Sequence, residues 1–354
     1  MISAFAIEKN FCFVVVLAGC GSKEAKPSST TSEKSDEKER IKISIGMLKL
    51  TPSAPIFIAM EKGFFEEENI EIDPQWFDAA QPVSVATAGN KVDVGATGLS
   101  ASIYNMAALG QKMYIVADKG MEKKDYPATV IMVQKGSSIK SIKDLKGKKI
   151  GITQTGGTYH YLLGRALELN GLSLEDVTVT PLGAIGATME TLKSKQVDAT
   201  LLSEPNVTKA INDGYGEALT PLGDELDSQN AAIFLSPQFY EKKEDAVRFM
   251  KAYIKACRYY YDAALKLENG KQIKGENFDE VVNIIAEYTG QPAENIEGAL
   301  PYMDRDGKLF KDDIQTQIDF YLKNKLIEKE IDSKEITDMK LWEEALKQLD
   351  KEEK

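Results

Sequence analysis

The sequence predicts an α/β fold with two lobes, each a mixed, mostly parallel sheet flanked by helices, and additional helices near the C-terminus. Two observations indicate this architecture. Segments with the apolar spacing of strands alternate with segments that have the spacing of helices, first over 41–117 and again over 149–213. Such alternation is typical of parallel sheets, and a repeat of this length indicates two similar α/β units.

The first unit begins with a segment, 41–46, in which apolar and polar residues alternate as in a half-buried strand. A helix follows and ends at Gly63, because glycine readily adopts the backbone conformation that ends a helix. The predicted strands of this unit are 41–46, 70–76, 92–96 and 113–117, and its predicted helices are 56–62, 81–88 and 98–109.

The second unit repeats this order. Gln81 lies eleven residues before Val92, and Gly186 lies eleven residues before Val197; each valine is followed by an aspartate. This matched spacing favours a true repeat over a chance alternation. The predicted strands are 149–153, 177–180 and 197–201, and the predicted helices are 159–170, 186–195 and 205–213.

Two passages, 118–146 and 222–236, connect the units, and each contains a further predicted strand, 128–134 and 231–236. A chain that crosses twice between two lobes forms a hinge. We assign 41–134 and 229–354 to lobe 1 and 135–228 to lobe 2. The remainder is helical and is expected to pack on lobe 1, with helices at 245–267, 279–289, 294–302, 311–322 and 341–349.

Composition limits the possible partners. The 354 residues carry a formal net charge of −11, which argues against nucleic acid or an anionic membrane surface as the main partner. The sequence has three cysteines and one histidine, with no Cys-x-x-Cys pair or histidine cluster, so we do not expect a zinc site. We expect no other metal and no cofactor.

The N-terminal segment predicts export. Residues 11–19 form an apolar run that is too short to span a bilayer and suits a secretory signal peptide over 1–19. The run ends at 17–20 (LAGC), which resembles the lipobox of bacterial lipoproteins and implies a lipid on Cys20. Residues 20–40 are polar and predict a flexible tether. The alternative is a buried N-terminal strand.

A glycine turn opens the helix of the second unit. Thr155, Gly156, Gly157 and Thr158 lie between a predicted strand and a predicted helix, so unpaired N–H groups and the helix dipole favour an acceptor there. Tyr159 adds a flat ring. The alternative is that a threonine merely caps the helix. The turn has neither the phosphate-loop nor the dinucleotide pattern.

Several motifs along the chain match one family. These are 59–65 (AMEKGFF), 91–95 (KVDVG), 144–151 (DLKGKKIG), 196–199 (QVDA) and Glu204-Pro205. Together they resemble the substrate-binding proteins of bacterial ABC importers, in the group for nitrate, sulfonates, taurine and thiamine-pyrimidine precursors. The resemblance implies a two-lobed periplasmic-binding-protein type II fold and delivery of a small-molecule ligand to a permease and ATPase complex. The expected state is an extracytoplasmic monomer that reaches the cell membrane through its lipid anchor.

The resemblance also implies a ligand site between the lobes, although each residue could instead have a structural role such as capping a helix. From lobe 1 it would use Thr51, Ser53, Gln81, Gly98, Leu99 and Ser100, and from lobe 2 Thr155, Gly156, Gly157, Thr158, Tyr159, Glu204 and Asn206.

These residues suggest a ligand with two different ends. Donors at the glycine turn would face an acceptor such as a sulfonate, and the Glu204 carboxylate would face an amine or ring N–H. A taurine-like sulfonate that carries an amine fits, and so does an aminopyrimidine, whereas nitrate does not fit well. An enzyme resembling the pyrimidine synthases is a third possibility, but their cysteine-rich segment is missing. A serine-histidine site would depend on His160, and 98–102 (GLSAS) lacks the final glycine of a nucleophile elbow.

Overall fold

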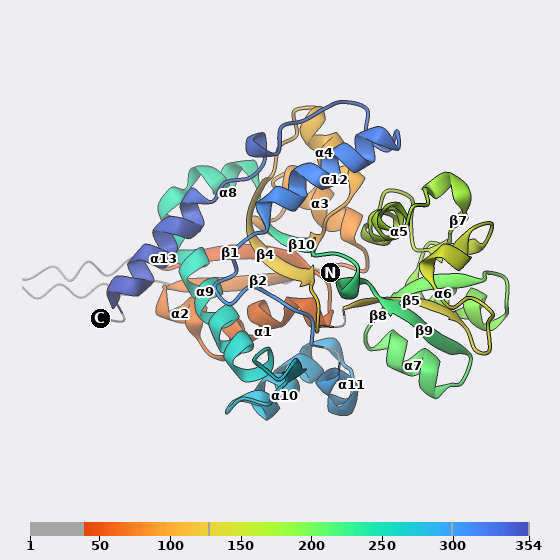
Figure 1. The fold of residues 1–354 in the computed structure, drawn as a ribbon. Coiled ribbons are helices and arrows are strands. Elements are labelled where there is room, and N and C mark those ends of the chain that lie inside the picture. Colours follow the sequence, from red (N-terminus) through yellow and green to blue (C-terminus); the bar gives the residue numbers. More distant parts are fainter. Residues whose placement is uncertain (1–38, 127, 299, 353–354) are drawn as a thin grey trace, which may run out of the picture. The chain divides into compact units, whose positions relative to one another are not determined.

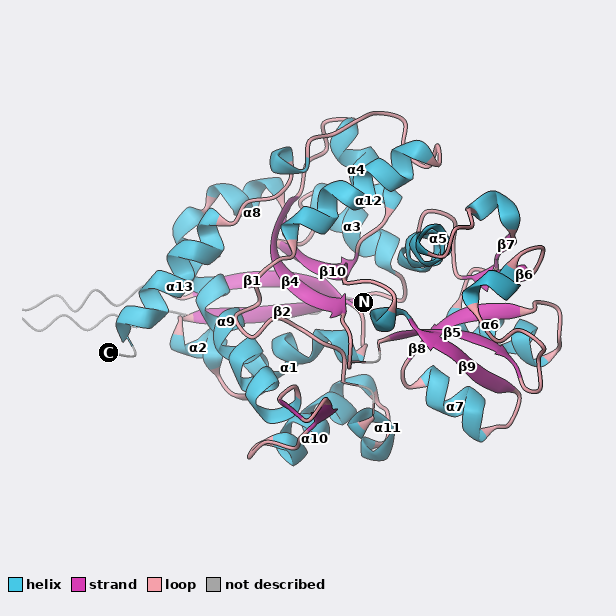
Figure 2. Cartoon of the chain, in the orientation of Figure 1, coloured by secondary structure: helices cyan, strands magenta, loops and turns pink. Residues whose placement is uncertain are grey.

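The computed structural model describes residues 39–126, 128–298 and 300–352, and these contain two five-stranded sheets and a two-stranded hairpin (Figures 1 and 2). The predicted signal peptide, the lipidation of Cys20 and nearly all of the tether lie outside the described residues. None of the described helices is long and apolar enough to cross a membrane.

The first sheet has the order β2-β1-β3-β10-β4. Strand β1 is parallel to β2 and β3, and β10 is antiparallel to β3 and β4. The four strands predicted in the first unit are confirmed, although the last continues further than expected. The strands are β1 (Ile41–Met47), β2 (Ile70–Trp76), β3 (Val94–Gly98), β4 (Tyr114–Glu122) and β10 (Ser228–Leu235).

The second sheet has the order β7-β6-β8-β5-β9. Its pattern repeats that of the first, because β6 is parallel to β7 and β8 while β5 is antiparallel to β8 and β9. Strand β9 was not predicted. The strands are β5 (Thr129–Gln134), β6 (Lys149–Ile152), β7 (Thr178–Pro181), β8 (Ala199–Ser203) and β9 (Gly216–Pro221).

The assignment of residues up to 134 to lobe 1 needs correction. Strand β5 pairs within the second sheet, so the chain crosses between the sheets before Thr129 and not after Gln134. The return crossing lies between β9 and β10. The apolar pattern of a strand does not indicate which strand it pairs with, so the boundary between lobe 1 and lobe 2 was predicted at the wrong end of β5.

The repeated Val-Asp motif has the same role in both sheets. The Asp93 carboxylate accepts the backbone N–H of Ser44 at 2.9 Å, and the Asp198 carboxylate accepts that of Lys149 at 2.8 Å. Each aspartate joins the start of its strand, β3 or β8, to the neighbouring parallel strand, β1 or β6. The spacing seen in the sequence therefore reflects one hydrogen-bonding device used twice.

Helices cover both sheets. The helices are α1 (Ala54–Glu61), α2 (Phe64–Glu67), α3 (Ala80–Ala88), α4 (Ala101–Ala108), α5 (Thr158–Leu169), α6 (Ile185–Lys193), α7 (Asn206–Asn212), α8 (Pro237–Glu241), α9 (Lys243–Ala264), α10 (Phe278–Thr289), α11 (Ala293–Glu297), α12 (Lys311–Lys323) and α13 (Lys340–Glu352). Short elements are the 3-10 helices Thr51–Ser53, Ile142–Leu145, Leu174–Asp176, Leu222–Asp224 and Ser333–Glu335, and the hairpin strands Leu267–Glu268 and Lys271–Gln272.

The C-terminal helices do not all pack on the first sheet alone. Helices α9, α10 and α13 contribute to the core beneath β1, whereas α12 belongs to a core that also contains α4 and α5. The ring of Phe320 on α12 meets Tyr161 on α5 edge-on, with centroids 5.2 Å apart. Helix α12 thus contacts both lobes, which corrects the expectation that these helices pack on lobe 1. The predicted helix at 294–302 is also shorter and ends at Glu297, directly before Gly298.

Candidate ligand-binding site

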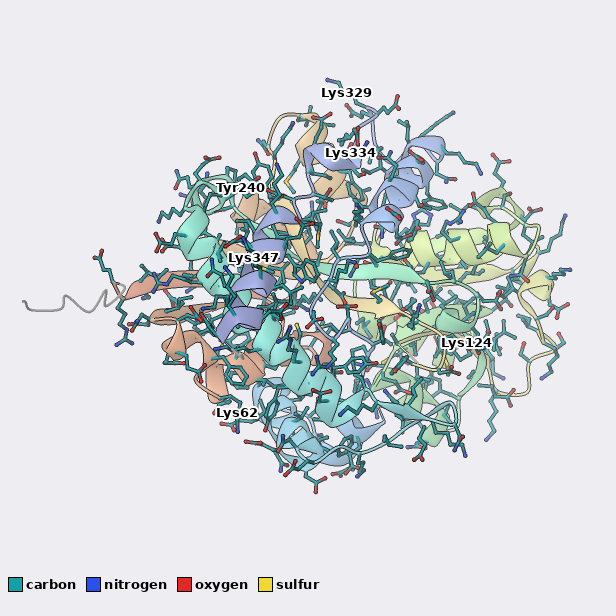
Figure 3. All side chains as sticks on the ribbon, turned by 60° about the vertical axis from the view of Figure 1, so that its left-hand side comes forward. Lys62, Lys124, Tyr240, Lys329, Lys334 and Lys347 are labelled. Carbon is teal, nitrogen blue, oxygen red and sulfur yellow. The ribbon has the colours of Figure 1, made fainter. Side chains whose placement is uncertain are left out.

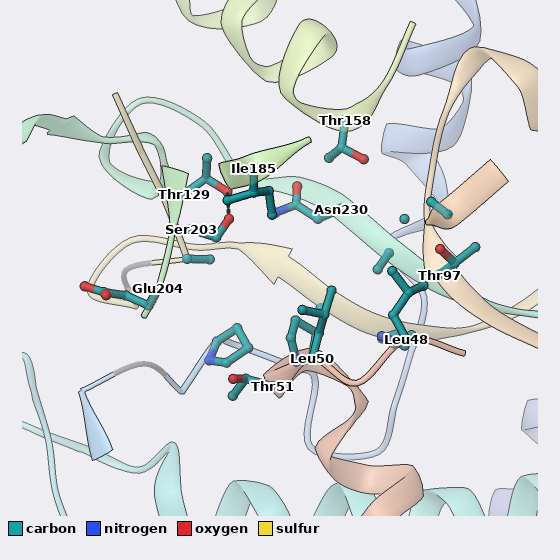
Figure 4. Close-up of a pocket in the computed structure, with 18 of the residues that line it drawn as sticks. Leu48, Leu50, Thr51, Thr97, Thr129, Thr158, Ile185, Ser203, Glu204 and Asn230 are labelled. Carbon is teal, nitrogen blue, oxygen red and sulfur yellow. Dashed lines mark hydrogen bonds between the residues drawn. The ribbon is translucent and has the colours of Figure 1, made fainter. Parts of the chain in front are cut away.

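A cavity of about 290 Å³ lies between the two sheets, where the ends of strands from both meet (Figure 4). This position agrees with the general rule that ligands of open α/β sheets bind beyond the carboxyl ends of the strands. Residues lining it include Leu48, Lys49, Leu50, Thr51, Ala80, Thr97, Gly98, Lys119, Gly120, Met121, Thr129, Thr158, Tyr159, Ile185, Ser203, Glu204, Asn206, Asn230 and Gln291.

The first-lobe wall contains two of the six predicted residues of that lobe, Thr51 and Gly98. The others lie outside the lining. Ser53 is fully buried and its hydroxyl donates to the carbonyl of Leu48, Gln81 is exposed on α3, and Ser100 pairs with the neighbouring Ser102. The backbone of Leu99 contacts a lining residue, because its N–H donates to the carbonyl of Asn230.

The glycine turn of the second lobe is bound largely to the first lobe. The Thr158 hydroxyl donates to the Leu99 carbonyl at 2.8 Å, and the Ala101 N–H donates to the Gly156 carbonyl at 2.8 Å. The Gly156 N–H donates to Nδ1 of His160 at 3.0 Å. Only Thr158 of the turn lines the cavity, while Thr155, Gly156 and Gly157 do not.

His160 has a local structural role. Its Nδ1 accepts the Gly156 N–H, and burial lowers its pKa, so the ring is neutral and stabilises the turn. This arrangement leaves it no role as the base of a serine nucleophile.

Glu204 and Asn206 both line the cavity, but the Glu204 carboxylate is already hydrogen-bonded. Its two oxygens accept the backbone N–H and the hydroxyl of Thr208, each at 3.0 Å. In Figure 4 this carboxylate points away from the other labelled side chains. The geometry therefore favours the helix-start role for Glu204 over contact with a ligand.

Hydroxyl groups form a chain along the second-lobe wall. The Tyr159 hydroxyl lies 2.8 Å from that of Ser203, which lies 3.3 Å from the hydroxyl of Thr129. Burial raises the pKa of Tyr159 to about 12, so it stays protonated at neutral pH. The chain presents hydroxyls that can donate to or accept from a bound molecule.

Lys119 is a candidate site residue that was not predicted from the sequence. It lies on β4, is 4% exposed and lines the cavity, and its ammonium has no hydrogen bond or ion pair to any described residue. Exposed lysines such as Lys124 and Lys329 instead lie at the molecular surface (Figure 3). Burial lowers the pKa of Lys119 from 10.5 to about 7, partly opposed by Asp118.

Two buried carboxyl groups flank Lys119 on β4. Asp118 accepts N–H groups from Gly120 and Asp304 at 2.7 and 2.8 Å, and Glu122 accepts from Thr129 and Asn230 at 3.2 and 2.5 Å. Burial raises the pKa of both carboxyl groups to about 7. A signal was present in the sequence: 118–122 (DKGME) continues the strand directly, but the prediction ended the strand at Ala117.

Two polar atoms on lining residues have no hydrogen-bond partner within the described part of the chain. These are Oγ1 of Thr97 and Oδ1 of Asn230, and both are occluded from water. A buried polar atom without a partner costs about 1–3 kcal/mol, so such atoms call for an explanation. Lys119 gives the cavity a cation that no described residue pairs with, whereas these two atoms belong to lining residues but are themselves occluded.

The donor set does not resemble a metal site. Among residues 39–126, 128–298 and 300–352, no cluster of three or more His, Cys, Asp or Glu side chains could hold a metal ion. The arrangement can instead surround a small organic molecule with an anionic group, which Lys119 and the hydroxyls would contact.

Comparison with known proteins places the chain in context. A model of the NMT1-like family matches residues 36–273. A putative aliphatic sulfonates-binding protein of Bacillus subtilis is 26% identical over 344 residues, which are 95% of this chain and 95% of that protein. The crystal structure of the periplasmic aliphatic sulphonate binding protein SsuA from Escherichia coli has a TM-score of 0.68 at 22% identity, over 83% of this chain and 91% of that chain. The structural likeness confirms the two-lobed periplasmic-binding-protein fold.

A partial match to an enzyme was also found. The 4-amino-5-hydroxymethyl-2-methylpyrimidine phosphate synthase of Schizosaccharomyces pombe is 35% identical over 97 residues, which are 27% of this chain and 27% of that protein. The Bacillus subtilis and Escherichia coli proteins, whose matches extend over most of the chain, are named as binding proteins.

Proposed function

Since this chain belongs to the NMT1-like family and is a solute-binding protein of an ABC import system, we propose that its solute is a small organic anion of the sulfonate class. The protein would hold the solute between its lobes and deliver it to the permease. The names of the Bacillus subtilis and Escherichia coli proteins support this class.

The observation that carries the proposal is Lys119, whose ammonium pairs with none of the residues that the structure describes. A buried ammonium is costly unless it is paired or loses its proton, and its pKa of about 7 reflects this cost. A sulfonate in the cavity would supply the missing negative charge and restore the protonated form. Charge-assisted hydrogen bonds are the stronger kind, so this contact would contribute much of the affinity.

The remaining lining suits a short carbon chain with an anionic end. The hydroxyls of Thr129 and Ser203 can donate to sulfonate oxygens. Apolar side chains from both lobes would contact the carbon chain, as is usual where a few polar groups orient a ligand in a mostly apolar pocket. These side chains are Leu48, Leu50, Met121 and Ile185.

The proposal extends to how the protein is held at the membrane. As a binding protein for an importer, it acts outside the cytoplasmic membrane. We expect Cys20 to carry the lipid, residues 20–40 to serve as the tether, and the folded part to act as a monomer.

Identification of the natural solute tests the proposal directly. Protein purified from cells would be denatured, the released ligand identified by mass spectrometry, and the binding of alkanesulfonates measured by calorimetry. We expect a sulfonate to be released and rebound at one molecule per chain. Retention of an aminopyrimidine or of nitrate, with no binding of sulfonates, would contradict the proposal.

A matched pair of lysine variants tests the role of Lys119. Lys119→Met should weaken sulfonate binding by about 10- to 150-fold, the range for a hydrogen bond to a charged group of about 1.5–3 kcal/mol. Lys124→Met, which removes an exposed lysine outside the cavity lining, should leave affinity unchanged. Equal affinity of the two variants would remove the basis for placing the anion at Lys119.

A further inference from the structure

A second lysine, Lys49, lies on the wall of the cavity. It belongs to the loop that follows β1, lines the cavity and is exposed, in contrast to Lys119, which is 4% exposed. The two segments are neighbours, because a Cβ on Gly120 of β4 would lie 3.7 Å from the side chain of Pro52 in that loop. The cavity thus has one cation at its buried end and another at its solvent-exposed edge.

An aromatic ring holds the Lys49 ammonium in place. Its Nζ lies 5.1 Å from the centre of the Trp76 ring, within the range of a cation–π contact. The Trp76 ring is itself packed against Phe57 and Tyr288, with ring centroids 6.2 and 6.3 Å away. A ring face attracts a cation through its quadrupole but carries no net charge, so the positive charge of Lys49 is not neutralised by this contact.

No described carboxylate neutralises Lys49. Its ammonium forms no hydrogen bond or ion pair with any residue of 39–126, 128–298 or 300–352. The other charged residues among those that line the cavity are Lys119 and Glu204, and the Glu204 carboxylate is already bound to Thr208. A solute with a single negative charge would therefore leave one of the two lysines without a partner of opposite charge.

The cavity has room for a solute with two acidic groups. Its volume of about 290 Å³ equals that of about ten water molecules, at about 30 Å³ each in the liquid. A two-carbon sulfonate fills only part of this volume. With a sulfonate at Lys119, space remains in the cavity that Lys49 also lines.

We propose that Lys49 forms a second anion subsite, so that the protein favours organic dianions, with a sulfonate at Lys119 and a second acidic group such as a carboxylate at Lys49. The inference rests on the proposed function and adds a second negative charge to the solute. An ammonium has three N–H donors, and those that do not face the Trp76 ring would form charge-assisted hydrogen bonds with the second acidic group. An uncharged tail would leave Lys49 with the ring alone.

Three sulfonates of the same chain length provide the test. Propane-1-sulfonate has an apolar end, 3-sulfopropanoate ends in a carboxylate, and 3-sulfopropanamide has nearly the shape of the carboxylate without its charge. Affinities would be measured by calorimetry at about pH 7, where an ordinary carboxylate is ionised. We expect 3-sulfopropanoate to bind about two- to fivefold more tightly than the amide, as for an exposed ion pair, and this ratio to fall as salt is added.

Lysine variants assign the effect to Lys49. Lys49→Met should reduce the carboxylate-to-amide affinity ratio to about one and leave the affinity for propane-1-sulfonate little changed, whereas Lys49→Arg keeps the charge and should keep most of the ratio. Lys193→Met is the matched control, because Lys193 is also exposed and its Nζ lies 6.0 Å from the Tyr215 ring centre, outside the cavity lining. That variant should keep the wild-type ratio. Each ratio compares two ligands of one variant, so a loss of stability does not imitate the result.

The outcomes distinguish this inference from the proposed function. If the wild-type protein binds 3-sulfopropanoate and its amide equally well, the second subsite is wrong while the sulfonate site stands. If Lys49→Met keeps the full ratio, Lys49 is not the site of the second charge. Succinate and succinamate would be measured in parallel. Binding of these two alone, with a preference for succinate that Lys49→Met removes, would refute the sulfonate class and support the subsite, and failure of all five probes would overturn both.

Discussion

Raising the pH is expected to weaken sulfonate binding because Lys119 loses its proton. Burial lowers the pKa of this lysine in the free protein from 10.5 to about 7. A bound anion favours the charged form, so the pKa is higher in the complex than in the free protein. Affinity is then greatest below about pH 7 and falls as the pH rises from the free pKa towards the bound one.

The size of the effect follows from the fraction of Lys119 that is protonated. With a free pKa of about 7 and a bound pKa well above the range studied, affinity should fall roughly 15-fold between about pH 7 and about pH 8.5. The slope cannot exceed tenfold per pH unit for one proton. The sulfonate itself stays ionised over this range, so it adds no slope.

Calorimetry across this pH range provides the assay, and Lys119→Arg provides the control. A guanidinium keeps its proton throughout, so the part of the slope due to Lys119 should disappear. Asp118 and Glu122, whose pKa values are also about 7, become charged as the pH rises and would repel an anion in the same direction. They remain in the variant, so the difference between the two slopes isolates Lys119.

Equal slopes for the wild-type protein and Lys119→Arg would refute this reasoning. Such a result would mean that the lysine is already charged at about pH 8.5 in the free protein, or that the anion does not contact it. Proton uptake on binding, measured from the calorimetric heat in buffers of different ionisation enthalpy, would decide between these two explanations.

Three further predictions concern packing, motion and attachment. Gly164→Ala on α5 should destabilise the fold by about 1–3 kcal/mol in denaturant unfolding, because a Cβ there would lie 2.3 Å from the Phe320 ring. Gly186→Ala on α6, where a Cβ meets nothing within 4 Å, should be neutral or stabilising by up to about 1 kcal/mol. Equal effects of the two substitutions on the free energy of unfolding would contradict the tight contact of α5 with α12. A saturating sulfonate should make the protein more compact in solution scattering by closing the lobes at the two crossings, and an unchanged radius would argue against closure. Cys20→Ser should release the protein from the membrane fraction, and retention there would disprove lipidation at that residue.

Local patterns were enough to predict the α/β class and most of the elements. The spacing of apolar residues is a local property of each segment. It predicts strands and helices correctly because the side chains on one buried face recur every two residues in a strand and every 3.6 residues in a helix. The Val-Asp spacing at Asp93 and Asp198 predicted the internal repeat, which the two matching hydrogen bonds now explain. The glycine turn was also located correctly, at the start of α5.

Tertiary structure decided what each segment pairs with. The pattern of β5 fits either sheet, and only the antiparallel pairing with β8 assigns it to the second lobe. Helix α12 is amphipathic and has the pattern of a helix packed on one lobe, yet its contact with Tyr161 joins it to the other. Strand pairing and helix packing depend on the surfaces of elements that are far apart in the sequence. The local spacing of apolar residues carries no information about those surfaces.

The chemistry of the site was likewise divided between sequence and structure. The family resemblance predicted six residues that line the cavity, and the net charge argued against nucleic acid or an anionic membrane surface as the main partner. The six residues are Thr51, Gly98, Thr158, Tyr159, Glu204 and Asn206. The sequence did not indicate that Lys119 is buried with no partner among the described residues, or that these residues leave the Asn230 oxygen without a hydrogen bond. The residue type determines the charge and the hydrogen-bonding groups of a side chain. Whether those groups have partners depends on residues far apart in the sequence, which only the fold brings together.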